Sequence, residues 1–578
     1  MKKNSVIIRL LSYTKRHIHF LIIALISAVI GVMLSLWAPV LIGDAVDYLL
    51  GKNQVDFGVL GRILLWLLIT VLLSALFQWL VSLCTNIVAF RTIRDIRTDA
   101  FNKLGQVPLK YIDGNSHGDL MARVVTDVDQ ISDGLLQGFT QLFTGIVTIL
   151  GTIGFMFYVN YKIAVIVILI TPLSLFVASF IGKRTHKQFQ EQSRTRGELG
   201  GYIEEMIGNQ KIVKAFHYED RAQNIFEEIN GRLYTCGVKA QFYSALTNPC
   251  TRFVNSVVYA AVGIFGAIGA VNGALTVGQL SSFLSYANQY TKPFNEITGV
   301  ITELQTAIAS ARRVFEMLDE PVESDDSNLP ELSECNGSVT LKHVGFSYRP
   351  DVTLIEDLNL SVQPGQRIAI VGPTGCGKTT IINLLMRFYD VTGGQISVSG
   401  HPITQVTRNS LRRQYGMVLQ ETWLFSGSIR DNIAYGKENA TEEEIIAAAK
   451  MAHAHSFIKR LEHGYDTLIS EDGENISQGQ KQLLCIARIM LTHPPMLILD
   501  EATSSIDTRT EIRIQRAFSK MMQGRTSFIV AHRLSTIKEA DVILVMNQGH
   551  IIEQGNHKQL LQQGGFYSNL YNSQFEQS

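Results

Sequence analysis

Five long stretches without Asp, Glu, Lys or Arg constrain this chain more than any other feature of its sequence. They cover residues 17–43, 63–90, 134–161, 163–182 and 253–291. About 20 apolar residues are enough to cross the hydrocarbon core of a bilayer. Helices in the core of a soluble protein seldom run this far without a charge. We therefore interpret the stretches as membrane spans, which agrees with a mean hydropathy of +0.14 over 578 residues.

The last of these stretches is too long for a single span. It contains GAVNGALT, residues 269–276, in which Gly and Asn give a turn signal. The turn divides the stretch into two helices. The sequence therefore predicts six membrane spans.

The Lys and Arg residues near the span ends predict the orientation. Connections rich in them are 1–16, 91–133 and 183–252. Connections poor in them are 44–62, 162 and 271–275. We therefore expect both termini in the cytoplasm and the chain in the cell membrane. Residues 1–16 are predicted to form an amphipathic helix on the inner leaflet.

Charge and cysteine content exclude several classes of protein. The formal net charge is zero, so nothing indicates bulk attraction to nucleic acid. The six cysteines are Cys84, Cys236, Cys250, Cys335, Cys376 and Cys485. None lies in a predicted external loop and none has metal-ligand spacing, so we expect neither disulfides nor a cysteine metal site.

The composition changes after about residue 305. The segment DEPVESDDSNLPELSECNG, residues 319–337, is acidic, contains proline and lacks periodicity, which is typical of a linker. Beyond it, short β-branched runs such as SVTLKHVGF, RIAIVG, MLILD, TSFIVAH and DVILVM alternate with helical patterns. That alternation predicts a soluble α/β domain with a largely parallel sheet.

RIAIVGPTGCGKTT, residues 367–380, combines an apolar strand, a glycine-rich loop and the start of a helix. The loop matches G-x-x-x-x-G-K-[ST], in which backbone N–H groups converge on phosphate oxygens. Lys378 supplies a positive charge for the β- and γ-phosphates, and the Thr379 hydroxyl suits Mg²⁺. Cys376 leaves a redox role open, although a small tolerated residue is the simpler interpretation.

MLILDE, residues 496–501, is a buried-strand pattern that ends in two carboxylates. Asp500 is placed to hold Mg²⁺, directly or through water. Glu501 is placed to polarise the attacking water as a general base. The alternative is a solvated acidic pair after a strand, which the phosphate-binding loop in the same domain disfavours.

Two more polar residues stand beside apolar strands. His532, in IVAHRLST, is placed to sense the γ-phosphate, and Gln420 lies in MVLQETW. Neither would mean much alone, because a histidine at a strand end is more often structural. Taken together with the phosphate loop and the acidic strand end, these residues follow one another in a recognisable order. In that order the chain resembles the ABC transporter superfamily, specifically the exporter type that fuses six membrane helices to one nucleotide-binding domain.

The resemblance covers nearly the whole chain and assigns roles to the residues that match its motifs. ISQGQ, residues 476–480, matches the family signature and SSID, residues 504–507, the D-loop. The residues implied to bind ATP are Tyr348 (stacking on adenine), Gly372, Pro373, Thr374, Gly375, Cys376, Gly377, Lys378, Thr379, Thr380, Ser477, Gln478, Gly479, Gln480 and Asp507. The implied catalytic residues are Glu501, His532 and the Q-loop Gln420. The implied Mg²⁺ ligands are Thr379, Gln420 and Asp500.

The same resemblance implies a fold and a domain order. The fold is an α-helical six-span membrane domain with long cytoplasmic helical extensions, followed by an α/β P-loop ATPase domain. The expected segments are an elbow helix (1–16), a transmembrane domain (17–310), a linker (311–336) and a nucleotide-binding domain (337–578).

The mechanism implied by the resemblance needs two chains. Two nucleotide domains close head to tail over two ATP molecules, each held between one chain's Walker A loop and the other chain's signature. Turns near residues 113–119 and 211–221 are expected to pass this closure to the membrane helices. The expected partners are therefore a second half-transporter chain, the lipid bilayer, ATP and Mg²⁺.

The cargo is the least constrained prediction. The last span, from residue 277, carries Gln279, Ser281, Ser282, Ser285, Asn288, Gln289, Lys292 and Glu296. Polar residues in a span usually face a cavity, which supports a path for an amphiphilic substrate. Multidrug efflux is the leading interpretation, and export of lipid or peptide stays open. A non-transporting ATPase is disfavoured by the six spans, and an importer by the fusion of the two domains in one chain.

Gln478 departs from the family signature LSGGQ, because it replaces the first glycine. A side chain there is expected to narrow the backbone choices and crowd the approach to nucleotide. Through head-to-tail geometry it acts on the partner's ATP, not on the site that contains Lys378 and Glu501. We therefore expect a heterodimer whose competent site uses this chain's hydrolytic residues. Tolerated variation in a homodimer is the alternative.

Overall fold

The computed structural model describes residues 3–49, 55–349, 351–419, 422–470, 475–500, 507–531 and 534–575. Predicted catalytic residues Gln420, Glu501 and His532 lie outside this set, as does most of the D-loop, 504–506. The chain divides into two compact units. One comprises Met1–Gln106 and Asn115–Glu320, and the other Val107–Gly114 and Pro321–Ser578.

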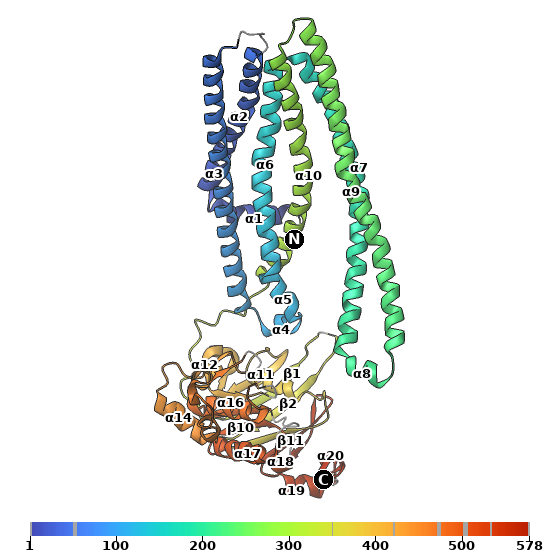
Figure 1. Ribbon diagram of the computed structural model, residues 1–578. Helices are drawn as coiled ribbons and strands as arrows, with labels where there is room; N and C mark the ends of the chain where they lie inside the picture. Colours follow the sequence, from blue (N-terminus) through green and yellow to red (C-terminus); the bar gives the residue numbers. More distant parts are fainter. Residues whose placement is uncertain are drawn as a thin grey trace. The chain divides into compact units, whose positions relative to one another are not determined.

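The described residues of the first unit form helices. They are α1 (Lys3–Lys15), α2 (Ile18–Leu49), α3 (Phe57–Leu104), α5 (His117–Val124), α6 (Thr126–Val159), α7 (Tyr161–Gly208), α8 (Gln210–Ala215), α9 (Glu219–Val271) and α10 (Val277–Leu318). Helices α2, α3, α6 and α10 pack together, and α7 lies beside α9 as a long pair (Figure 1). Helix α1 is the predicted elbow helix.

Each predicted span lies in a separate long helix, namely α2, α3, α6, α7, α9 and α10. The predicted turn between the last two is confirmed: α9 ends at Val271 and α10 begins at Val277. Gly273 adopts φ +71°, and Thr276 caps α10 together with Gln279 in a reciprocal capping box.

Among the described residues, four helical stretches are both long and apolar enough to cross a membrane. They are Ile18–Leu49, Phe57–Leu104, His117–Val159 and Arg252–Val271. The spans predicted in α7 and α10 are not among these four. Several side chains of α7 lie outside the described set, and α10 carries the polar residues noted above.

Small residues let α2 and α10 approach closely. A Cβ atom on Gly278 would lie 2.0 Å from the Gly43 carbonyl oxygen, so a larger residue does not fit. The hydroxyl groups of Ser282 and Tyr286 donate hydrogen bonds to the carbonyls of Pro39 and Leu36, both at 2.6 Å. Close backbone contact plus interhelical hydrogen bonds holds membrane helices together without a hydrophobic driving force.

Helix α10 extends further than the sequence predicted, because the linker was expected to begin at residue 311. The helix ends at Leu318 instead. Its last turns bury Phe315, whose ring stacks on Tyr13 of α1 at 6.2 Å. This packing outweighs the acidic composition that follows. Residues 319–338, all described, then carry neither helix nor strand.

Arg408 binds this linker at Ser324 and Asp326. Its guanidinium donates to the carbonyl and the hydroxyl of Ser324, both at 2.9 Å. Its backbone N–H donates to Asp326 at 2.6 Å. Leu332 is buried in the core of the second unit. Residues 324–332 are therefore packed as part of the nucleotide-binding domain.

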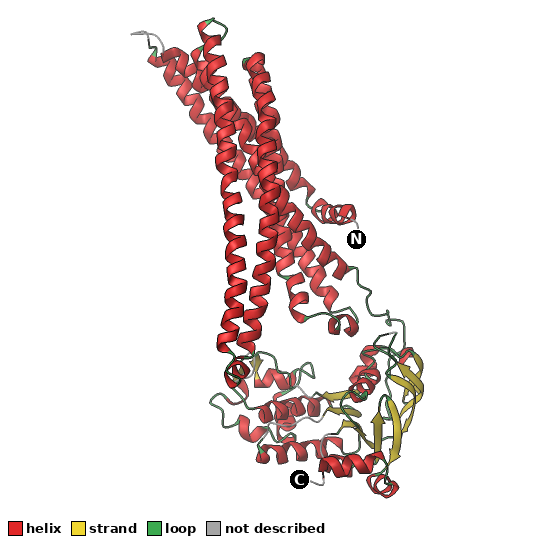
Figure 2. Cartoon of the chain, turned by 90° about the vertical axis from the view of Figure 1, so that its right-hand side faces the viewer, coloured by secondary structure: helices red, strands yellow, loops and turns green. Residues whose placement is uncertain are grey.

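The second unit combines strands with short helices (Figure 2). Its strands are β1 (Val339–Phe346), β2 (Ile355–Val362), β3 (Arg367–Val371), β4 (Gly393–Val398), β5 (His401–Pro402), β6 (Tyr415–Val418), β7 (Gly427–Ser428), β8 (Leu468–Ile469), β9 (Met496–Asp500), β10 (Thr526–Val530), β11 (Val542–Asn547) and β12 (His550–Gly555). Its helices are α4 (Leu109–Asp113), α11 (Lys378–Leu385), α12 (Arg408–Arg413), α13 (Ile429–Ala434), α14 (Glu442–Met451), α15 (His455–Ile458), α16 (Gln478–Thr492), α17 (Thr508–Met522), α18 (Leu534–Lys538), α19 (His557–Gln563) and α20 (Phe566–Phe575), with 3₁₀ turns η1 (Ile403–Gln405) and η2 (Gly464–Asp466).

The predicted parallel sheet is confirmed for most of these strands. Its order is β12-β11-β3-β10-β9-β6, and only β12 runs antiparallel to its neighbour among the described pairs. Strand β1, however, belongs to a second, antiparallel sheet with the order β2-β1-β4-β5. The alternating burial of β1 and β2 fits a sheet with one solvated face, whereas β3 and β9 are buried almost throughout.

Candidate nucleotide site

The glycine-rich loop lies between β3 and α11. Strand β3 is buried from Ile368 to Val371, and the chain then turns into a loop whose tip, at Thr374 and Gly375, is exposed. Gly377 caps α11 with φ +104°, a left-handed conformation that favours glycine. The backbone N–H groups at the start of α11 therefore point into the loop, where an anion is stabilised.

Close packing explains why the loop starts with glycine. A Cβ atom on Gly372 would lie 2.2 Å from the Met546 carbonyl oxygen and 2.8 Å from the Cys376 sulfur. The loop therefore sits directly on the end of β11. Its shape and its backbone donors fit the phosphate chain of ATP.

Lys378 places its charge at the centre of this loop. Its ammonium donates to the carbonyls of Gly372 and Pro373 at 2.8 and 2.9 Å, and lies 3.9 Å from the Cys376 sulfur. Cys376 is 3 % exposed and packs inside the loop. This burial supports a structural role for Cys376. All six cysteines are free thiols in the structure.

Tyr348 lies beside the end of the loop. Its hydroxyl is 3.3 Å from the Thr380 hydroxyl and accepts a hydrogen bond from Asn383, also at 3.3 Å. Tyr348 remains 38 % exposed, so part of this residue is accessible to a base. These contacts bring the predicted adenine-stacking residue and the predicted phosphate loop together.

The register of the sheet places Asp500 near the same edge. Val530 of β10 pairs with both Asp500 of β9 and Ile370 of β3, and all three strands run parallel. Their carboxyl ends therefore share one edge, where ligands bind in open α/β sheets. Thr379 stands in the first turn of α11. A hydroxyl, a carboxylate and nucleotide phosphates are oxygen ligands that suit Mg²⁺.

The signature begins a long helix. Ser477 is the N-cap of α16 and forms a capping box with Gln480: the Gln480 N–H donates to the Ser477 hydroxyl, and the Ser477 N–H donates to the Gln480 side chain. Gly479 is buried in the first turn. In the described part of the chain, no hydrogen bond joins these residues to the loop at Gly372–Thr380.

Gln478 adopts an ordinary helical backbone as the first residue of α16. The expected restriction of the backbone therefore causes no strain at this position, because the first helical position accepts most residues. Its side chain is exposed and donates a hydrogen bond to the Thr422 hydroxyl at 3.0 Å. The substituted signature residue is thus connected to the segment that follows Gln420.

Asp507 caps α17. Its carboxylate accepts a hydrogen bond from the Thr510 N–H at 3.0 Å, and this bond holds the pKa of Asp507 below its usual range. The carboxylate is fully exposed to solvent. Its role at the D-loop stays a prediction.

Sequence reasoning missed one residue of this region, Tyr389. Its ring lies 5.0 Å from the Tyr348 ring and 5.8 Å from the Phe346 ring, both edge to face. Its hydroxyl donates to Asp113, which ends α4 in one of the two predicted coupling turns. Tyr389 and Asp113 are 276 positions apart, so no local pattern could have paired them. The other predicted turn forms α8, and its contact with a nucleotide domain stays a prediction.

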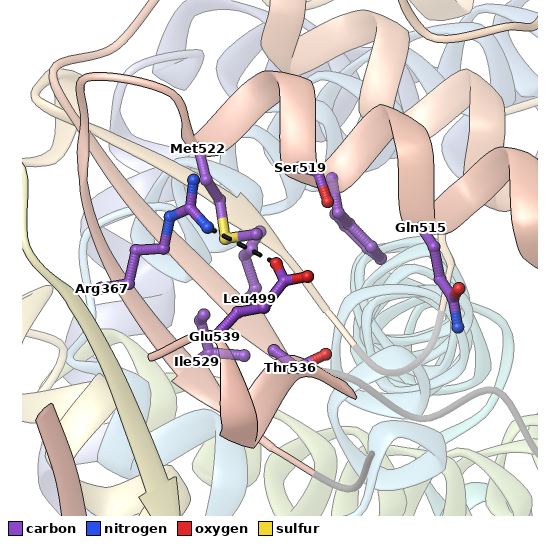
Figure 3. A pocket seen from close by; sticks show the side chains of 9 residues that line it. Arg367, Leu499, Gln515, Ser519, Met522, Ile529, Thr536 and Glu539 are labelled. Carbon is purple, nitrogen blue, oxygen red and sulfur yellow. Dashed lines mark ion pairs between the residues drawn. The ribbon is translucent and has the colours of Figure 1, made fainter. Parts of the chain in front are cut away.

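One cavity of the second unit is not part of the nucleotide site. It lies among α17, α18 and strands β3, β9 and β10, and Arg367 and Glu539 form an ion pair across it at 3.6 Å (Figure 3). Its volume of about 70 Å³ is well below the range of ligand pockets, which begins at about 300 Å³.

Comparisons with known proteins identify the family of both units. Residues 21–294 match the family model described as "ABC transporter transmembrane region", and residues 355–504 match the family model described as "ABC transporter". The chain is 43% identical over 526 residues to the fatty acid ABC transporter ATP-binding/permease protein of Mycobacterium bovis, covering 90% of this chain and 83% of that one.

Two further comparisons extend over almost the entire length. The chain is 34% identical to the ATP-dependent lipid A-core flippase of Syntrophus aciditrophicus, over 98% of this chain and 94% of that one. It superposes on a bacterial Atm1-family ABC exporter solved with ATP bound, with a TM-score of 0.78, 30% identity, and coverage of 97% and 98%. The chain therefore belongs to the ABC transporters, as an exporter-type half-transporter whose ATPase domain is coupled to transport across a membrane.

Proposed function

We propose that this chain exports amphiphilic compounds, in multidrug-type efflux, as one half of a heterodimer in the cell membrane. ABC exporters work as dimers in the lipid bilayer. The observation that carries the heterodimer is the combination of an intact phosphate loop with Gln478 in the signature. Both termini lie in the cytoplasm in this proposal.

The competent ATP site in this proposal uses the hydrolytic residues of this chain. Lys378 and the loop Gly372–Thr380 hold the phosphates, and Tyr348 stacks on adenine. Glu501 polarises the attacking water and His532 contacts the γ-phosphate. Thr379, Asp500 and Gln420 would hold Mg²⁺, which would neutralise phosphate charge when bound. The partner contributes a signature of the LSGGQ type.

The second ATP site is the one that Gln478 affects. The exposed position of Gln478 at the start of α16 supports a contact across the dimer interface. Its hydrogen bond to Thr422 holds the amide in place, so the partner's ATP meets a side chain where the family has only a Cα hydrogen. The partner's site is therefore the slower one, and the partner can lack the Walker B glutamate without loss of turnover.

The amphiphilic cargo is supported by an open apolar groove of about 670 Å³ along α2 and α6. Its lining residues are Val29, Met33, Trp37, Val147, Leu150, Gly151, Gly154, Phe155 and Tyr158. This volume suits a drug-sized or lipid-like molecule. Two relatives are named for fatty acids and for lipid A-core, and both of these cargoes are amphiphiles.

A homodimeric lipid exporter is the second candidate. It is favoured by the helical backbone at position 478, which accepts glutamine without strain. The likeness to the lipid A-core flippase over almost its full length points the same way.

ATPase measurements separate the two candidates. The purified chain is reconstituted alone and with its candidate partner, and ATPase activity and ATP-dependent uptake of a labelled amphiphile into inside-out vesicles are recorded. The heterodimer predicts weak activity alone and full activity with the partner. Full, substrate-stimulated activity of the chain alone contradicts the heterodimer and supports the homodimer. Absence of ATP-dependent uptake in every combination contradicts amphiphile export.

A further inference from the structure

We propose that a cluster of arginines, where α1 meets α2 and α3, binds the headgroup of an anionic phospholipid. The arginine cluster consists of Arg16, Arg91 and Arg94. The lipid is a partner of the membrane domain and is distinct from both ATP and the transported cargo. It belongs to the leaflet on the side of the amino terminus, which is the cytoplasmic leaflet in the proposed function.

Side-chain contacts bring the three arginines together from separate elements. Arg16 directly follows α1, and its guanidinium lies 3.7 Å from the carboxylate of Asp95 in α3. Arg94 pairs with the same carboxylate at 2.9 Å. Arg91 precedes Arg94 by three positions, so both stand on one side of α3. The Arg91 guanidinium lies over the Phe20 ring of α2, 5.2 Å from its centre. The end of α1 and the start of α2 therefore meet α3 at the arginine cluster.

The arginine cluster lies at a boundary between apolar and charged parts of the chain. The charge-free stretch 17–43 begins directly after Arg16, and the stretch 63–90 ends directly before Arg91. Lipid headgroups lie just outside the hydrocarbon core that such stretches cross. Helix α1 lies across the long helices of its unit (Figure 1), as a helix on the membrane surface does. The guanidinium groups therefore stand at the depth of the headgroups.

The arginine cluster has more positive charge than its surroundings neutralise. In the described part of the chain, Asp95 is the only carboxylate that forms an ion pair with these arginines, and its side chain is 17 % exposed. The side chains of Arg16 and Arg94 remain 62 % and 70 % exposed, and Arg91 is exposed as well. Three exposed cations beside one mostly buried carboxylate leave a positive surface.

Exposed apolar side chains lie next to the arginine cluster. Ile18 and Ile22 of α2 are exposed, and so is Phe90 of α3, which directly precedes Arg91. The acyl chains of a lipid have these side chains to lie against while the phosphate meets the guanidinium groups. A free phosphate ion would gain only the second contact. The surface therefore fits a lipid rather than a soluble anion.

The chemistry of the arginine side chain defines the headgroup. A planar guanidinium donates two parallel hydrogen bonds to a phosphate group. Each Lys or Arg near an anionic membrane surface strengthens binding about fivefold. A headgroup with a cation of its own, such as that of phosphatidylcholine, brings a like charge to the arginine cluster. The lipid class is therefore an anionic phospholipid, of which phosphatidylglycerol is the simplest probe.

Lipid binding in detergent tests the proposal without ATP. The full-length chain, with its partner where one is required, is purified in an uncharged detergent and titrated with phosphatidylglycerol or phosphatidylcholine of the same acyl chains. Native mass spectrometry counts the bound lipids, and a photoreactive phosphatidylglycerol identifies the contacted peptides. We expect phosphatidylglycerol to bind about tenfold or more tightly than phosphatidylcholine. Crosslinks are expected in residues 16–26 and 83–94, and inorganic phosphate is expected not to displace the lipid.

Matched variants locate the binding. Arg91→Gln and Arg94→Gln are each expected to weaken phosphatidylglycerol binding about fivefold, and Arg91→Lys to weaken it less because the charge is kept. Arg184→Gln is the control. Arg184 is also exposed, follows another charge-free stretch and lies over the Phe180 ring at 4.7 Å, so its loss removes the same kind of contact outside the cluster. Arg16→Gln serves if Arg91→Gln does not fold.

The outcomes separate this inference from the proposed function. Equal binding of the two lipids by the natural chain overturns the inference, as do crosslinks confined to other segments or displacement by inorganic phosphate. An equal loss of binding in Arg184→Gln and Arg91→Gln also overturns it. Selective binding at the arginine cluster without ATP-driven uptake supports the inference and contradicts the proposed export. ATP-driven uptake by a chain without lipid preference supports the export and overturns the inference.

Discussion

The hydroxyl of Tyr389 donates a hydrogen bond of 2.5 Å to the carboxylate of Asp113. Burial, and then this carboxylate, raise the pKa of Tyr389, so the hydroxyl keeps its proton. The Tyr389 ring also packs edge to face on Tyr348, whose hydroxyl approaches Thr380 of the phosphate loop. A continuous set of contacts therefore leads from the α4 turn to the nucleotide loop.

Tyr389→Phe removes only the hydroxyl and leaves the ring packing in place. We expect the amount of substrate moved per ATP hydrolysed to fall severalfold, because Asp113 loses its donor while the nucleotide loop is preserved. Uptake and phosphate release are measured in the same vesicles to obtain this ratio. An unchanged ratio would show that the hydrogen bond is structural only.

Gln478→Gly tests the heterodimer from the signature side. In the chain alone, both ATP sites use this signature, so the change is expected to raise ATPase activity severalfold. In the heterodimer the competent site uses the partner's signature, so the rise is expected to be clearly smaller. Thr422→Val breaks the hydrogen bond to Gln478 while keeping glutamine, and separates the effect of that bond from the effect of side-chain bulk. Equal rises in both preparations contradict the asymmetric arrangement.

Glu501→Gln tests the general base, which lies outside the described residues. A general base contributes about 10²–10⁴-fold to a rate. The rate of ATP hydrolysis is therefore expected to fall by at least about 10²-fold. Binding of a fluorescent ATP analogue is expected to persist, because the amide is nearly isosteric. Glu462→Gln, an exposed glutamate elsewhere in the domain, is the matched control. If the Glu501→Gln variant hydrolyses ATP at nearly the natural rate, Glu501 is not the general base.

Gly372→Ala tests the close contact below the phosphate loop. The added Cβ would lie 2.2 Å from the Met546 carbonyl, so the loop has to move. We expect a loss of about 1–3 kcal/mol in stability, as for an overpacked core, and weaker ATP binding. Gly393→Ala is the control, since its Cβ would meet no atom within 4 Å. Similar behaviour of the two variants in thermal unfolding and ATP titration contradicts the role of the contact.

Tyr415→Phe and Tyr567→Phe remove the same atom from two different environments. The Tyr415 hydroxyl is buried and has no hydrogen-bond partner among the described residues, whereas the Tyr567 hydroxyl lies 2.8 Å from a ring nitrogen of His557. We expect Tyr415→Phe to be neutral or stabilising by about 1 kcal/mol, and Tyr567→Phe to be destabilising by about the same amount. The midpoint temperatures of thermal inactivation of the two variants and the natural chain are compared at one scan rate. Equal destabilisation of the two variants contradicts the expectation.

Much of the fold could be predicted because its signals are local. The charge-free stretches, the turn at 272–276 and the strands around Arg367–Val371 and Met496–Asp500 all follow from short patterns. The antiparallel partner of β1 and the extension of α10 to Leu318 could not be predicted. Both depend on contacts with distant segments, as the stacking of Phe315 on Tyr13 shows.

The site follows the same division. The phosphate loop is continuous in sequence, so its glycines and Lys378 could be identified before the structure. The bond between Tyr389 and Asp113, and that between Gln478 and Thr422, join segments 276 and 56 positions apart. The helical backbone at Gln478 could not be predicted, because the motif pattern does not reveal that the helix starts at this residue.

The binding of the linker by Arg408 shortens the tether between the two halves of the chain. Taken as an extended chain, the 21 steps from Leu318 to the start of β1 at Val339 could span about 70 Å. Because Ser324 and Asp326 are held by Arg408, only the first six steps remain, with a reach of about 20 Å. Any displacement of the ATPase domain that exceeds the reach of this free segment therefore exerts a force on the end of α10. Helix α10, which includes Lys292, is therefore mechanically coupled to the ATPase domain through the linker, by a route independent of the coupling turns.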